Sequence, residues 1–290
     1  MYEFTRRPKW IVGHLFALSM VALFITAGLW QLSRHYWRQG INEALRERSD
    51  LPAEDLPDLM AEVPPGGRPD DIEYRMATAR GTYQVGQEIL IRNRSFEGAS
   101  GCHVLTPLAL DSQPADSTMP WAVLVVRGWI PLTDCEQYPI ESELPTTGTV
   151  EVTGLVRLTQ TKGFLGATDP AEGVLSEMAR VDIDRIRRQS SFNLYDVYLE
   201  LATQIPPGDD LPAPVPPPER TNGPHLGYMV QWFLFAAVVV VGYPLILRHQ
   251  AHKGAAETPV EPPSAPASVD PTDGEPETSR TESPVSTPPS

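Results

Sequence analysis

The sequence predicts an α+β membrane protein in which two transmembrane helices flank a β-rich extracytoplasmic domain. Two observations lead to this fold class. An almost purely apolar stretch lies near each end of the 290-residue chain. The residues between them, 33–224, carry short runs of β-branched and apolar side chains separated by Gly and Pro, which is typical of strands. We expect this domain to form a small barrel or a curved antiparallel sheet with minor helices.

The first apolar stretch, residues 10–32, reads WIVGHLFALSMVALFITAGLWQL. At a rise of 1.5 Å per residue, about 22 helical residues reach roughly 33 Å, enough to cross the hydrocarbon core of a membrane. Arg6, Arg7 and Lys9 precede it. A secretory signal peptide has the same charge pattern, but its apolar core is usually about 7–15 residues long and a small-residue cleavage site follows. We therefore expect an uncleaved anchor.

The second apolar stretch covers residues 225–247, and Arg248 and Lys253 follow it. Positive charge before the first span and after the second favours a cytoplasmic position for both termini. We therefore expect a protein of the bacterial plasma membrane whose two terminal segments, residues 1–9 and 248–290, lie in the cytoplasm. The second of these segments is rich in Pro, Ser, Thr and Glu, so we expect a disordered acidic tail.

Between the spans, a polar helix is expected to continue over residues 34–54, until a series of prolines interrupts it. Residues 182–189 predict a short helix. A proline-rich connector, residues 206–219, returns the chain to the membrane. The run WAVLVVRGWI predicts a central strand. The strand patterns cover residues 74–83, 88–93, 103–110, 122–130, 149–157 and 194–203.

Composition and motifs exclude several function classes. The formal net charge is −14, whereas nucleic-acid recognition needs a basic surface. The chain lacks nucleophile-elbow, zinc-protease, P-loop and dinucleotide motifs, and His103 is the single histidine well inside the domain. We therefore do not expect an enzyme.

Two cysteines, Cys102 and Cys135, bracket the hairpin predicted from residues 103–110 and 122–130. Residues just outside the ends of an antiparallel pair lie close together, so a disulfide is one interpretation on an oxidising side of the membrane. Two unrelated thiols are the second interpretation, and copper binding is the third.

Chemically informative residues gather at the outer ends of the two spans. Each set has the spacing i, i+3, i+4, i+7, which places its members on one helix face. An imidazole there is a suitable haem ligand, and arginines pair with propionates. Anchoring at the membrane interface explains the same residue types. The sets are Gln31, Arg34, His35 and Arg38 on the first span, and His225, Tyr228, Met229 and Trp232 on the second.

Several motifs, in order, resemble the SURF1 family (Surfeit locus protein 1, a cytochrome c oxidase assembly factor). They are Gly28-Leu29-Trp30-Gln31-Leu32 with Arg34 and Trp37, Gly81-Thr82-Tyr83, Asn93-Arg94, Gly101-x-His103-Val104-Leu105-Thr106-Pro107-Leu108, Val126-Arg127-Gly128-Trp129-Ile130-Pro131, and His225-Leu226-Gly227-Tyr228 with Gln231-Trp232-Phe233. Together they cover about residues 20–250.

The resemblance implies a factor that holds or delivers haem a to oxidase subunit I, with haem a synthase as a further partner. His225 stands at the motif position implicated in haem binding in some bacterial members. Arg34 and Tyr228, with His35 and Trp232 on the same faces, are expected as supporting groups. The resemblance also implies structural roles for Gly128 and Trp129.

Two further expectations accompany this interpretation. Gln31 and Gln231 are polar residues within the spans and are expected to hydrogen-bond across the span pair. The alternative function is a non-haem accessory or docking protein that resides in a respiratory oxidase complex.

Overall fold

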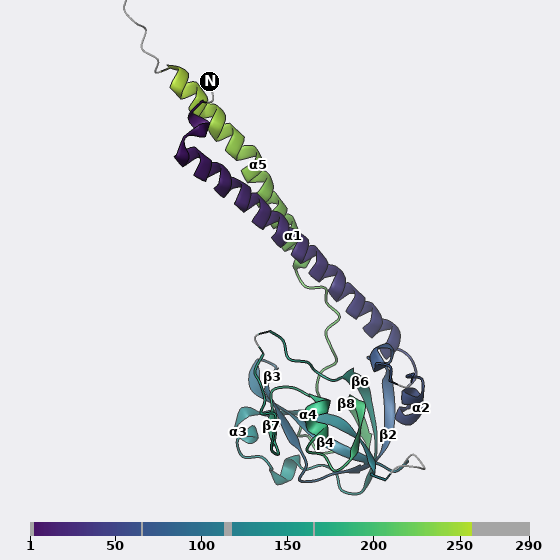
Figure 1. The fold of residues 1–290 in the computed structure, drawn as a ribbon. Helices are drawn as coiled ribbons and strands as arrows, with labels where there is room; N and C mark the ends of the chain where they lie inside the picture. Colours follow the sequence, from purple (N-terminus) through teal and green to yellow (C-terminus); the bar gives the residue numbers. More distant parts are fainter. Residues whose placement is uncertain (1–2, 65, 113–117, 165, 257–290) are drawn as a thin grey trace, which may run out of the picture. The chain divides into compact units, whose positions relative to one another are not determined.

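A computed structural model describes residues 3–64, 66–112, 118–164 and 166–256 of the chain (Figure 1). The described helical elements are η1 (Glu3–Arg6), α1 (Pro8–Ser49), α2 (Leu56–Ala61), η2 (Pro69–Asp71), α3 (Leu132–Cys135), η3 (Glu141–Glu143), α4 (Ile183–Arg187) and α5 (His225–Ala256). The strands are β1 (Glu54–Asp55), β2 (Met76–Tyr83), β3 (Ile89–Phe96), β4 (Ala99–Leu110), β5 (Trp121–Pro131), β6 (Thr149–Leu158), β7 (Glu177–Met178) and β8 (Asn193–Ile205).

Helices α1 and α5 are long and apolar enough to cross a membrane. The polar continuation predicted after the first span is present, and α1 ends at Ser49, shortly before Pro52, because a proline disfavours helix in the residue that precedes it. Helix α5 continues past the predicted span to Ala256, so the start of the predicted tail is helical. The rest of that tail, residues 257–290, lies outside the described residues.

The strands form one eight-stranded sheet in the order β1-β2-β6-β8-β5-β4-β3-β7, and every predicted strand is confirmed within a few residues at each end. The predicted α+β fold class is confirmed, and most strand pairs are antiparallel, but the sheet is mixed because β5 and β8 pair in parallel. The chain forms β6, β7 and α4 between these two strands and so re-enters the sheet beside β5 in the same direction. β2 also pairs with β4 over three residues, so the pairings of β2, β6, β8, β5 and β4 form a ring. The ring is not fully closed, because the pairing of β5 with β8 ends at Val126 and Glu200.

Strand β5 is the centre of the hydrophobic core, as its β-branched sequence predicts. Side chains alternate between the two faces of a strand, and here both faces are covered. Val123 and Val125 belong to one buried cluster, whereas Leu124 and Val126 belong to another, and all four are at most 2 % exposed. At about 25 cal/mol per Å² of apolar surface, this two-sided burial makes β5 a main source of the domain's stability.

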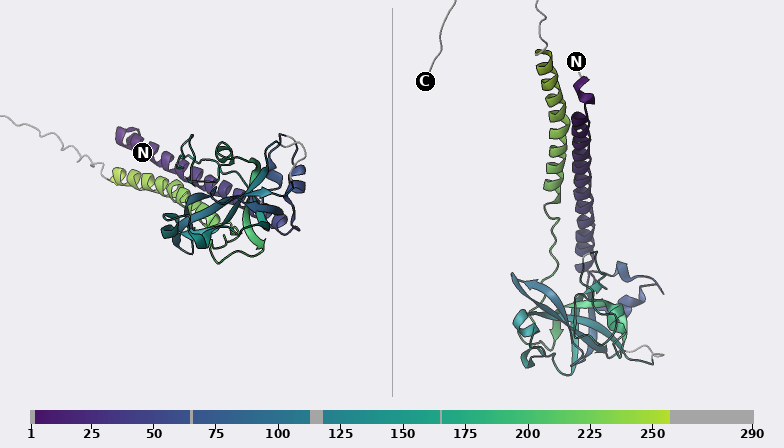
Figure 2. Two further views of the ribbon diagram at one scale, coloured as in Figure 1. Left: turned by 90° about the horizontal axis from the view of Figure 1, so that it is seen from below. Right: turned by 60° about the vertical axis from the view of Figure 1, so that its left-hand side comes forward.

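The connector runs from the sheet to α5 as a thin thread (Figure 2), and backbone hydrogen bonds tie it to the end of β5. Trp129 and Ala213 exchange two backbone hydrogen bonds, of 2.7 and 2.8 Å. At Gly128 a Cβ atom would lie 2.6 Å from the carbonyl oxygen of Pro212, which no side chain allows. The indole of Trp129 donates to the carbonyl of Arg94 at 3.1 Å. Gly128 and Trp129 therefore have a packing role, because they allow the connector to lie directly on the sheet.

Cys102 and Cys135 form a disulfide. Cys102 is on β4, opposite Ile130 of β5, and Cys135 ends the short helix α3 that follows β5. The bond therefore joins the two sides of the hairpin that the two cysteines bracket in the sequence.

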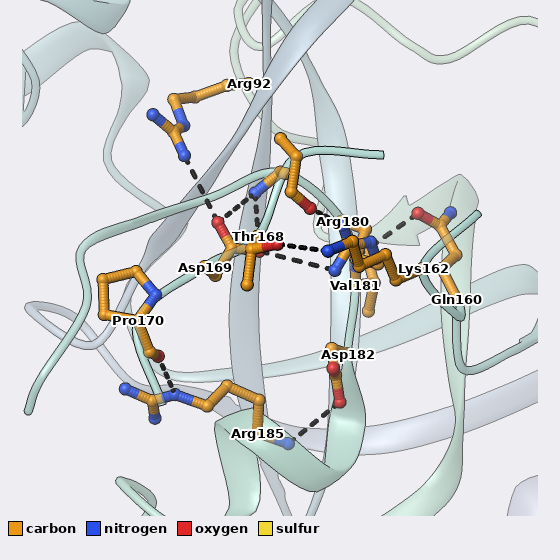
Figure 3. A network of polar contacts seen from close by, with 12 residues as sticks. Arg92, Gln160, Lys162, Thr168, Asp169, Pro170, Arg180, Val181, Asp182 and Arg185 are labelled. Atoms are coloured by element: carbon orange, nitrogen blue, oxygen red, sulfur yellow. Dashed lines mark hydrogen bonds and ion pairs between the residues drawn. The ribbon is translucent and has the colours of Figure 1, made fainter. Parts of the chain in front are cut away.

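A polar network orders the segment between β6 and β7 (Figure 3). The carboxylate of Asp169, whose side chain is 5 % exposed, accepts the backbone N–H of Ala179 at 2.9 Å and pairs with Arg92 of β3 at 3.3 Å. Arg185 of α4 donates to the carbonyls of Pro170 and Gly173 at 2.8 and 2.7 Å. These bonds hold the segment against β3 and α4.

Candidate functional site at the paired helices

Helix α1 contacts the first turns of α5 near Gly28. A Cβ atom at Gly28 would lie 2.8 Å from the ring of Phe233, so a side chain there would displace this ring. The ring of Phe24 stacks on that of Trp232, with centroids 5.8 Å apart. Small residues at helix contacts are how apolar helices associate in lipid, where the hydrophobic effect between helices is absent.

Next to this contact, the Nδ1 atom of His225 lies 2.9 Å from the Oε1 atom of Gln31. An amide oxygen only accepts hydrogen bonds, so Nδ1 carries the proton and donates it. In the neutral ring the lone pair then lies on Nε2, the nitrogen that faces away from Gln31. A histidine that ligates a metal through one ring nitrogen usually donates the proton on its other nitrogen to a neighbouring acceptor.

A glycine just before α5 lies close to the Nε2 atom of His225. Gly223 has φ +66°, a conformation that favours glycine, and a Cβ atom there would lie 3.4 Å from Nε2. Just before it, the side chain of Asn222 accepts a hydrogen bond from Asn42 of α1 at 2.6 Å. This bond ties the connector to α1 and so positions the start of α5.

Two cations follow Gln31 on α1. The guanidinium of Arg34 lies 3.8 Å from the centroid of the Trp37 ring, and that of Arg38 lies 6.0 Å from it. In the described part of the chain neither arginine forms an ion pair. His35 is half-buried, and its Nδ1 atom is buried without a hydrogen-bond partner. This face of α1 therefore has positive charge and an unsatisfied imidazole nitrogen.

The structure brings only some of the predicted site residues together. Gln31 and His225 are bonded, and Trp232 packs on α1. Tyr228 is 50 % exposed, and the described residues include no hydrogen-bond partner for its hydroxyl. The hydrogen bond expected between Gln31 and Gln231 is not formed there either, because Gln31 bonds to His225 and Gln231 is exposed on the surface of α5.

Sequence reasoning missed a second histidine contact. The hydroxyl of Tyr243 lies 2.7 Å from the Nδ1 atom of His14, and the two rings meet edge to face at 5.6 Å. Polar groups inside apolar spans are costly, so each of them was a signal to look for a partner. The sequence could not show that these two meet, since they are far apart along the chain.

A β-rich domain carried between two candidate membrane-spanning helices, with a histidine fixed at the first residue of the second helix, defines a class of membrane-anchored protein. The model of the SURF1 family matches residues 18–237, so the chain belongs to that family.

Relatives agree with this assignment. A SURF1-like protein of Mycobacterium bovis is 25 % identical over 266 residues, which cover 89 % of this chain and 93 % of the relative. A SURF1-like protein of Caenorhabditis elegans is 25 % identical over 263 residues, covering 80 % and 73 %. Surfeit locus protein 1 of Takifugu rubripes is 26 % identical over 162 residues, covering 51 % and 62 %. The resemblance found in the sequence motifs is thus confirmed.

Proposed function

We propose that this chain is an assembly factor for the haem–copper cytochrome c oxidase that holds haem a at His225 before its insertion into subunit I. Membership of the SURF1 family supports the assembly role. The hydrogen bond of 2.9 Å between His225 and Gln31 carries the haem part of the proposal, because it leaves Nε2 free to bind iron.

The residues around His225 suit this cargo. The side chain is half-buried, and the residue that lies beside Nε2 is a glycine, Gly223, which has no side chain to cover it. Arg34 has no carboxylate partner among the described residues, so its guanidinium is available to a propionate. Haem, when bound, would supply an iron that takes an imidazole nitrogen as a ligand, and His225 would provide that nitrogen. We assign supporting roles to His35, Tyr228 and Trp232.

In this proposal the two helices span a bacterial plasma membrane with both termini in the cytoplasm. The β-rich domain then lies on the opposite side. The helices bind subunit I laterally, and haem a synthase supplies the cargo. The chain performs no covalent chemistry in this role, so it is not an enzyme.

The test is an optical spectrum of the detergent-purified full chain, co-expressed with the enzymes of haem a synthesis. We expect the wild type to carry haem a absorbance and His225→Ala to lose it. His249→Ala is the matched control, because His249 is an exposed histidine on the same helix. It should keep the chromophore.

Two results would contradict the haem assignment. One is a colourless wild type that still co-purifies with subunit I, which would leave the docking role alone. The other is equal absorbance in the wild type and in His225→Ala.

A further inference from the structure

A cavity lies where β5 and β8 separate. The parallel pairing of the two strands ends at Val126 and Glu200, whereas β8 stays paired with β6 as far as Ile205. Residues 201–204 of β8 thus have a strand on one side only. A cavity of about 280 Å³ lies here. It is lined by these residues and by part of the connector, within residues 207–214.

Arg127, the residue after the last paired position of β5, also lines this cavity and is 7 % exposed. Its Nε atom donates to the hydroxyl of Thr106 at 3.0 Å. Its Nη2 atom donates to the carbonyl of Glu143 at 2.5 Å and lies 3.4 Å from the hydroxyl of Tyr138. All three partners are uncharged. Within the described residues Arg127 has no ion pair, and its Nη1 atom has no hydrogen bond.

Two other arginines of the domain show what a structural role requires. Arg157 pairs with the carboxylate of Glu200 at 3.2 Å. Arg185 is equally buried and has no carboxylate, but all three of its nitrogens donate to carbonyl or amide oxygens of the surrounding loop. A buried charge normally has a partner of opposite sign or a full set of hydrogen bonds. Among the described residues, Arg127 has neither a partner of opposite charge nor a full set of hydrogen bonds. Its Nη1 atom has no partner, and Arg127 lines a cavity.

The carboxyl group of Glu143 forms no ion pair with Arg127, and only its backbone carbonyl bonds to the guanidinium. Burial and the neighbouring Asp134 raise the pKa of Glu143 to about 7, although the charge of Arg127 opposes this rise. The carboxyl group is therefore only partly ionised near neutral pH. The remaining acid at the cavity, Asp209, is exposed and forms no ion pair among the described residues.

We propose that this cavity binds a carboxylate side chain from an extended segment of a partner protein, which adds to the free edge of β8 at residues 201–204. The charge of Arg127 selects an acidic side chain. The cavity, of about 280 Å³, lies at the lower limit of the roughly 300–1,000 Å³ of sites for small molecules and has room for a carboxylate side chain. Backbone groups on an unpaired strand edge are the usual acceptors of an extended peptide. This site is independent of the proposed haem function.

The test measures fluorescence anisotropy with the full chain in detergent and labelled acetyl-Thr-Val-Glu-Val-Thr-amide. The matched probe has Gln in place of Glu. We expect the Glu peptide to bind about ten- to hundredfold more tightly, the usual worth of a hydrogen bond to a charged group. This comparison uses only the wild type, so it does not depend on the folding of a variant.

Variants of the chain then test whether the peptide carboxylate contacts Arg127 in this cavity. Arg127→Gln should remove the preference for Glu, whereas Arg80→Gln, which removes an exposed arginine elsewhere in the sheet, should keep it. Ala202→Asp adds a carboxylate at an exposed position of the cavity wall and should weaken the Glu peptide at least tenfold. Equal binding of the two peptides, no binding of either, or competition by acetate at the concentration of the peptide would overturn the proposal.

Discussion

The two histidine contacts between α1 and α5 differ in what the partner allows. His225 meets an amide oxygen of Gln31, which can only accept, so the proton of the ring is fixed on Nδ1. His14 meets the hydroxyl of Tyr243, which can donate or accept, so its partner fixes neither tautomer. The same ring at nearly the same distance thus leaves a lone pair on Nε2 of His225, whereas the contact of His14 determines neither tautomer. The two contacts therefore differ in whether the partner determines the tautomer of the histidine ring.

The largest expected effect concerns a third histidine, His103 of β4, whose protonation is set by burial rather than by a hydrogen-bond partner. Burial and the charge of Arg94 lower the pKa of His103 to about 4. The unfolded ring then binds a proton between about pH 4 and 6.5 and the folded ring does not, so the free energy of unfolding rises with pH over this range. The contribution is roughly 3 kcal/mol at most, present in full above pH 6.5.

This prediction is checked by urea unfolding of the full chain in detergent, followed by tryptophan fluorescence from pH 4 to 7. His103→Gln should have a flatter pH dependence than the wild type, and His249→Gln should not. Identical slopes for the wild type and His103→Gln would show that burial does not set the charge of this ring.

The next effect is expected when the hydrogen-bond partner of each histidine, Gln31 or Tyr243, is replaced. Gln31→Leu removes the acceptor of His225, and loss of such a partner typically lowers the affinity of a metal site about ten- to hundredfold. Tyr243→Phe removes the corresponding group at His14 and should leave haem a binding unchanged. Titration of apo-protein with haem a, read by absorbance, gives both affinities. An equal loss in the two variants would mean that helix pairing, and not the tautomer of His225, controls binding.

The smallest effect concerns the glycines beside the two contacts. A Cβ atom at Gly28 would lie 2.8 Å from the ring of Phe233, whereas one at Gly13 would lie 3.3 Å from the hydroxyl of Tyr243. Alanine improves helix propensity equally at both positions. We therefore expect Gly28→Ala to be less stable than Gly13→Ala by about 1 kcal/mol, the lower end of the cost of overpacking.

Thermal unfolding in detergent measures this difference. Phe233→Leu should restore part of the stability of Gly28→Ala and leave that of Gly13→Ala unaffected. A larger loss at Gly13 would reverse the assignment of the tighter helix contact.

Local patterns were sufficient to predict the elements. The apolar run of β5 and the prolines after α1 act over a few residues, so their consequences can be predicted from the sequence. The direction of β8 could not be predicted, because it depends on how β6, β7 and α4 route the chain back into the sheet. The network around Asp169 was missed for the same reason, since β3 and the segment before β7 supply its two sides.

For the candidate site, the sequence by itself determined the membrane-anchored class, the family motifs and the choice of His225. Only the tertiary structure decided that Gln31 bonds to His225 rather than to Gln231, and that Arg127 lines a cavity and forms no ion pair among the described residues. The physical reason is common to both. A hydrogen bond or a buried charge depends on atoms a few ångströms away, and residues 194 positions apart reach that distance only once the chain is folded.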